Sequence, residues 1–84
     1  MEKCSTLNSL LPGHAGRILE IIGANDMKRR LLDIGFVKNT LVTCEGSSIH
    51  GNPKAYSLRG CVIALRTQDS QNILIQEVDY DSFT

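Results

Sequence analysis

The sequence predicts a small, mainly β protein, a barrel of about five short strands with one short α-helix inserted in the first long connection. Its 84 residues suffice for one domain, and 42% apolar with 21% charged residues is typical of a chain that folds. Apolar residues recur in short runs separated by glycines and polar residues, which indicates strands. In so small a chain, closure into a barrel removes the exposed sheet edges.

The first predicted strand runs from Arg17 to Ile22, after a turn at Pro12-Gly13. Side chains alternate between the two faces of a strand, and here neither face is purely apolar. The pattern therefore leaves open which face of this strand packs inward.

A change of period after this strand predicts a helix of about ten residues. It begins near Asn25 or Asp26, either of which has the short polar side chain of an N-cap residue. Apolar residues then recur with helical spacing at Met27, Leu31 and Ile34, and Leu32 widens this stripe. A helix this short is marginal alone, so we expect its stripe to pack against the sheet.

A glycine followed by an aromatic residue predicts where the helix ends. Gly35 is placed to adopt the left-handed C′ conformation, with Phe36 packing back on the last turn. Lys38-Asn39-Thr40 follows as a turn, in which Asn39 tolerates positive φ.

The remaining strands follow from alternation and from runs of branched residues. Leu41 to Glu45 alternates and predicts a strand with Val42 and Cys44 inward. The other expected segments are a polar loop over 46–53, a strand around Tyr56 and Leu58, a bulge or bend at Gly60, a largely buried strand from Cys61 to Leu65, and a last strand over 73–78. Together these segments describe an SH3-like barrel that occupies 1–84 as one domain, with a core over about 7–78 and a frayed acidic tail over 79–84.

Composition excludes several classes. The longest apolar run is Cys61 to Leu65, far short of the roughly twenty residues of a membrane-spanning helix. The N-terminus shows no secretory signal, and three cysteines without a C-x-x-C pair predict reduced thiols and a cytoplasmic protein. A formal net charge of zero offers no electrostatic reason to bind nucleic acid or anionic lipid.

The sequence contains neither a complete nucleotide-binding motif nor a recognisable catalytic motif. The loop from Gly46 to Pro53 has the glycine spacing of a phosphate-binding loop, but Asn52-Pro53 occupies the positions of its lysine and serine or threonine. His14 and His50 have no serine or cysteine in a recognisable nucleophile motif. We therefore expect no nucleotide binding and no enzymatic activity.

Two binding hypotheses stay open at this point. A transition-metal site is one, with Cys4, His14 and His50 as candidate ligands, although none has the short spacing that makes a metal site recognisable in a sequence. Cys44 and Cys61 are better explained as core residues. The other is a partner-binding helix face at Lys28-Arg29-Arg30, whose simpler interpretation is a solvated surface. Few aromatic residues argue against stacking on nucleic acid.

Four motifs, in order and spacing, resemble those of the FeoA family, the ferrous iron transport protein A family. They are Pro12-Gly13-x-x-Gly16-x-Ile18, the run Arg30-Leu31-Leu32-Asp33-Ile34-Gly35-Phe36, Gly51-Asn52-Pro53, and Tyr56-x-Leu58-Arg59-Gly60-x-x-Ile63-Ala64-Leu65-Arg66. The resemblance covers roughly residues 7–78 and implies an SH3-like barrel with a helical insertion. The chain departs from the family at Lys38-Asn39, where Pro-Gly is usual, and at 49–52 in the loop.

The resemblance implies a small cytosolic accessory protein of ferrous iron uptake. Its implied partner is FeoB, a membrane transporter with a cytosolic GTP-binding domain, and it acts without inserting into the membrane. We predict the contact residues from their expected exposure as Arg29, Arg30, Ser48, His50, Asn52, Pro53 and Arg59. The alternatives are an Fe²⁺-binding sensor or carrier and, less favoured, a barrel that binds nucleic acid.

Overall fold

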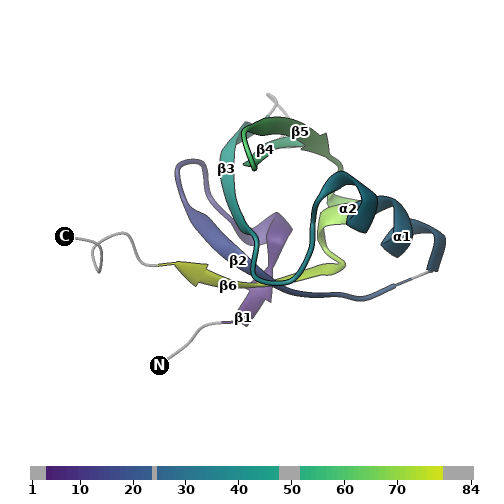
Figure 1. Ribbon diagram of the computed structural model, residues 1–84. Helices are drawn as coiled ribbons and strands as arrows, with labels where there is room; N and C mark the ends of the chain where they lie inside the picture. The colour runs from purple at the N-terminus through teal and green to yellow at the C-terminus, as the bar shows by residue number, and fades with distance from the viewer. Residues whose placement is uncertain (1–3, 24, 48–51, 79–84) are drawn as a thin grey trace.

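One curled antiparallel sheet dominates the computed structural model, which describes residues 4–23, 25–47 and 52–78 (Figure 1). Its six strands within these residues lie in the order β1-β6-β2-β3-β4-β5. Their bounds are β1 (Cys4–Thr6), β2 (Ala15–Ile21), β3 (Leu41–Ser47), β4 (Lys54–Leu58), β5 (Cys61–Leu65) and β6 (Ile73–Val78). The helices are α1 (Asn25–Ile34) and the single turn α2 (Thr67–Ser70), and the 3₁₀ turn is η1 (Leu7–Ser9). The predicted small β-barrel with one inserted helix is confirmed.

The N-terminal segment closes the barrel through side chains. β1 and β5 are the two edges of the sheet, and η1 follows β1 directly. Lys54 Nζ donates hydrogen bonds to the carbonyls of Asn8, at 2.6 Å, and Leu10, at 3.1 Å. Tyr56 Oη donates to the Leu7 carbonyl at 3.4 Å. These bonds tie β4 to η1, so β1 and η1 belong to the barrel although the sequence analysis did not predict either.

A β-bulge decides which face of β2 points inward. Ile18 and Ile21 are both buried, although three positions separate them and strict alternation would place them on opposite faces. The register of β2 against β6 shifts between Ile18 and Glu20, where an additional residue enters β2. The bulge re-aims Ile21 into the core and resolves the question that alternation left open.

The core confirms part of the predicted pattern and corrects another part. Val42 and Cys44 point inward and are fully buried, as expected. The prediction that Cys61 to Leu65 is largely buried is wrong, because only Leu65 is buried and Val62 is 67% exposed. β5 pairs with β4 alone, so its outer face and one edge lie open to solvent.

The C-terminal end of α1 has the predicted geometry. Gly35 adopts φ of 129°, and its N–H donates to the Leu32 carbonyl at 3.1 Å. The Phe36 N–H donates to the Leu31 carbonyl at 3.0 Å, which completes a Schellman motif. Phe36 is fully buried, and Asn39 has the positive φ expected for the following turn.

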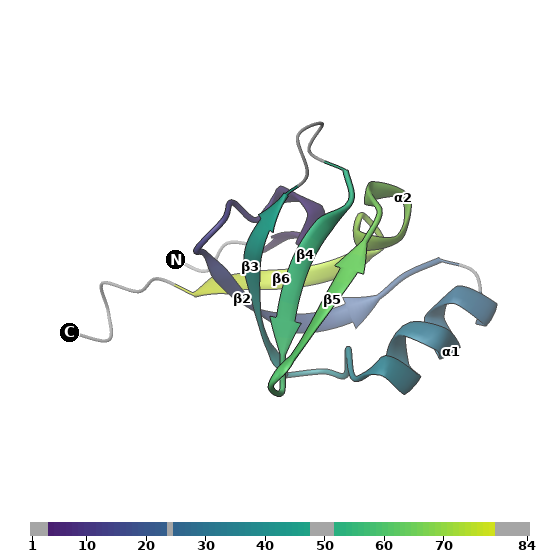
Figure 2. The ribbon, with the colours of Figure 1, turned by 90° about the horizontal axis from the view of Figure 1, so that it is seen from above.

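The helix α1 starts at one of the two predicted residues, whereas its predicted apolar stripe needs correction. The helix begins at Asn25, so Asn25 and Asp26 lie in its first turn, where the Asp26 carboxylate complements the helix dipole. Of the stripe, Leu31 is buried and Met27 packs partly against the core, whereas Leu32 and Ile34 are 38% and 41% exposed. The helix lies outside the barrel (Figures 1 and 2).

Tyr56 makes the stability of the barrel decrease as the pH rises through the alkaline range. Burial raises the pKa of its hydroxyl above the ordinary 10.0, the Ser70 side chain offsets part of this by hydrogen bonding, and nearby Cys44 adds to the increase. A raised pKa contributes stability that is fully present below the unfolded pKa and is lost as pH rises toward the folded one.

We therefore expect the free energy of unfolding of Tyr56→Phe to fall less steeply than that of the wild type above pH 10.0. At neutral pH the variant should lose about 1 kcal/mol, because the bond to the Leu7 carbonyl is absent. Urea denaturation of both proteins at neutral and alkaline pH measures the difference. Parallel curves on the alkaline side would contradict this role of Tyr56.

Candidate functional site

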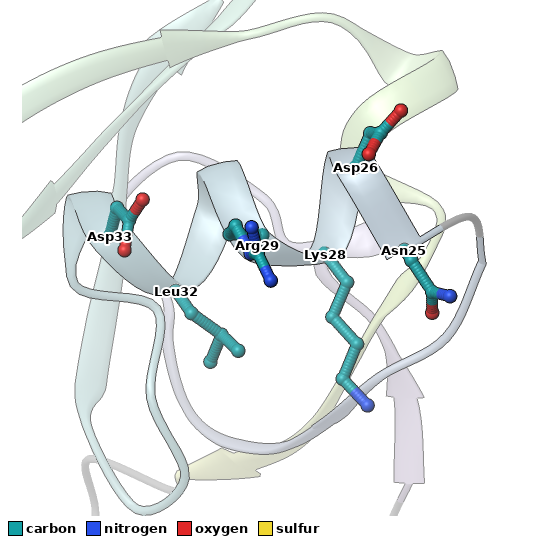
Figure 3. A pocket seen from close by; sticks show the side chains of 6 residues that line it. All are labelled: Asn25, Asp26, Lys28, Arg29, Leu32 and Asp33. Carbon is teal, nitrogen blue, oxygen red and sulfur yellow. The ribbon is translucent and has the colours of Figure 1, made fainter.

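The solvent side of α1 carries an open hollow (Figure 3). It is lined by Asn25, Asp26, Lys28, Arg29, Leu32 and Asp33, which we call the helix surface. All six residues belong to α1. The helix packs on the barrel through Leu31 and Met27, and this small contact leaves the rest of the helix facing solvent. The amphipathic pattern of the sequence thus places a mixed polar and apolar face outward.

The basic side chains next to this hollow are available for a partner. Lys28, Arg29 and Arg30 are all exposed, and no ion pair within the described residues engages them. Lys28 and Leu32 project to the same side of the helix (Figure 3). An exposed leucine beside uncommitted cations offers apolar area and charge together, which the sequence analysis missed because it assigned Leu32 to the buried stripe.

Arg59 lies near the C-terminal end of α1. It forms, with Gly60, the two-residue turn between β4 and β5, and both residues have positive φ, at 50° and 83°. The preceding Leu58 approaches α1, since a Cβ added at Gly35 would lie 3.5 Å from Leu58 Cδ1. Figure 2 shows the turn and this end of α1 at the same end of the molecule. The structure thus places the turn that contains Arg59 at the same end of the molecule as the C-terminal end of α1.

The other predicted contact residues do not join this region. Asn52 and Pro53 precede β4, at the opposite end of that strand from Arg59, about 16 Å away for a five-residue strand. Asn52 Oδ1 accepts a hydrogen bond from the Thr67 backbone N–H at 3.0 Å, so its side chain anchors the start of β4 to α2. Ser48 and His50 lie outside the described residues.

The candidate metal ligands are not brought together among the described residues. In the sheet, Cys4 on β1 lies opposite Gln76 on β6, and Gln76 lies opposite Arg17 on β2. His14 lies three positions before Arg17 along the chain, so the backbone positions of Cys4 and His14 are roughly 14 Å apart. Metal ligands must lie about 2 Å from one ion, so these two side chains do not share one. The described part of the chain contains no group of three potential ligands, and His50 lies outside it.

Comparison with protein families decides the assignment. The FeoA domain profile matches residues 5–77, nearly the whole chain. The chain belongs to the FeoA family. This family is linked to ferrous iron transport. A comparison with curated protein sequences gave no match.

Solved FeoA structures share the fold. A FeoA-like protein from Clostridium acetobutylicum superposes with a TM-score of 0.81 at 29% identity, over 89% of this chain and 87% of that one. FeoA from Stenotrophomonas maltophilia, an SH3 domain protein complexed with zinc, gives 0.74 at 26% identity, over 83% and 87%. A manganese-dependent transcriptional repressor gives 0.81 at 16% identity, and this chain spans 41% of its length, which shows the barrel alone.

The FeoA assignment agrees with the described architecture. The SH3-like fold expected from the sequence is confirmed, including the helix inserted between β2 and β3. No helix among the described residues is both long and apolar enough to cross a bilayer. The predicted contact residues stay predictions.

Proposed function

We propose that this FeoA protein is a non-enzymatic interaction module that docks on the cytosolic GTPase part of a FeoB-type ferrous iron transporter and modulates it from the cytoplasm. The observation that carries the proposal is the helix surface, where exposed Lys28, Arg29 and Leu32 surround a hollow. The family link to ferrous iron transport supports the partner class. A role as a ferrous iron transport activating factor has been suggested for the Stenotrophomonas maltophilia relative.

The helix surface suits protein docking better than it suits a small ligand. The hollow is open and is built from one helix, whereas small-molecule sites enclose most of their ligand in a cleft. Arg29 and Arg59 offer exposed guanidinium groups that pair with carboxylates in two-pronged geometry. A partner with an acidic rim around an apolar contact for Leu32 complements this arrangement.

Titration of isotope-labelled protein with the soluble GTPase domain of the organism's ferrous iron transporter tests the proposal. We expect amide shifts confined to α1 and the Arg59-Gly60 turn, while the amide of Asn52 at the other end of β4 stays unperturbed. The titration is run with and without a GTP analogue, since the transporter's nucleotide state sets its surface. No localised shifts in either state would rule out docking on this domain.

A further inference from the structure

β5 is an unprotected edge of the sheet. It pairs with β4 only, and no backbone hydrogen bond outside the sheet involves residues 61–65, all of which the structure describes. In a hairpin closed by a two-residue turn, the residues flanking the turn form a hydrogen-bonded pair, here Leu58 with Cys61. The backbone groups of Ile63 and Leu65 then also face β4, and those of Val62 and Ala64 point outward from the sheet.

The side chains of β5 do not discourage strand pairing. Val62 is 67% exposed and Ala64 is also exposed, while the strand contains no charged residue and no proline. Charges, prolines and very short length are the usual protections of an edge strand. The opposite edge, β1, has such a protection, because it is only three residues long. The two edges therefore differ, and β5 is the one that offers a template.

We propose that β5 pairs antiparallel with β5 of a second copy of this chain, across a two-fold axis at Ile63. This register places Val62 opposite Ala64 of the second copy, so that both outward-facing backbone pairs bond to each other. Cys61 falls opposite Leu65, and Arg66 falls opposite Gly60. No two charged residues lie directly opposite, and the exposed apolar side chains cover one another. The strand is thus self-complementary, both in the positions of its outward-facing backbone N–H and C=O groups and in its side chains.

The size of this contact sets its strength. Two five-residue strands bury much less than the roughly 1,200 Å² of a stable interface, so the dimer should form at about 0.1–1 mM protein.

Sedimentation velocity across this concentration range tests the pairing, with Val62→Lys as the disrupting variant and Leu11→Lys as its matched control. Both changes place a lysine at an exposed apolar position, 67% and 61% exposed, but only Val62 lies on β5. The wild type and Leu11→Lys should dimerise alike, and Val62→Lys should weaken dimerisation at least about ten-fold, as a charge at a paired edge strand requires. A monomeric wild type, or a Val62→Lys protein that dimerises equally, would overturn the proposal.

A second measurement does not depend on a variant. A wild-type sample mixed from labelled and unlabelled copies should show intermolecular contacts between Val62 of one copy and Ala64 of the other, in filtered NMR spectra at high concentration. Intermolecular contacts located only on α1 would assign self-association to another surface and would also overturn the β5 pairing. The GTPase-domain titration remains a separate test, because it reads α1 and not β5.

Discussion

Phe36→Ala is expected to lower the free energy of unfolding by about 3–5 kcal/mol, the usual effect of truncating a buried aromatic side chain. Phe36 is fully buried in the cluster that contains Leu31, Tyr56 and Leu58. It also follows the Schellman motif that ends α1, so its loss removes packing at the helix terminus. Urea denaturation followed by circular dichroism measures the change.

The position of α1 makes this variant informative beyond its overall stability. Leu31 is the buried residue of the helix, with Met27 packing partly, so Phe36 supplies much of the anchor for its C-terminal end. Amide exchange in α1 should therefore accelerate more than exchange in β2 or β6. Leu11→Ala, at a 61% exposed position, serves as the control and should change stability by less than about 0.5 kcal/mol. A Phe36→Ala protein as stable as this control would contradict the packing described above.

Charge reversal at Arg29 or Arg59 is expected to weaken docking on the transporter GTPase domain about ten-fold for each residue, since an attraction of exposed charges becomes a repulsion. The loss should appear mainly in the association rate and should shrink at high salt, as for charges at the rim of an interface. Surface plasmon resonance at two salt concentrations with Arg29→Glu and Arg59→Glu separates the two effects.

Arg66→Glu is the matched control for this series. Arg66 is exposed, it undergoes the same change of charge, and it lies at the opposite end of β5 from Arg59. Affinity should stay close to that of the wild type if the docking region is the helix surface with the adjacent turn. Equal losses in all three variants would indicate a response to net charge, and unchanged affinity for Arg29→Glu would remove the helix from the interface.

Local rules account for the parts of the fold that the sequence predicts correctly. Gly35 and Asn39 adopt positive φ because few other residues tolerate that conformation, so their positions mark the end of α1 and the next turn. Val42 and Cys44 point inward because alternation in a half-buried strand is strict. Both features depend only on residues close together in the chain, so they can be recognised without a tertiary structure.

The parts that needed the structure depend on contacts between distant segments. The bulge in β2 arises from its pairing with β6, more than fifty positions along the chain, and it alone places Ile21 in the core. The exposure of β5 follows from the order of strands in the sheet, because the same apolar run would be buried in a central strand. Closure by Lys54 across η1 is likewise invisible in a local pattern.

The candidate site likewise has features that the sequence predicts and features that only the structure shows. The sequence by itself identified a basic helix, a turn at Arg59 and membership of an iron-transport family, because these rest on residue types and their spacing. Only the tertiary structure decided that the turn at Arg59 lies at the same end of the molecule as the end of α1, that Asn52 anchors α2, and that Leu32 faces solvent. Spacing along a chain determines local conformation, whereas the packing of non-adjacent segments determines which side chains share a surface.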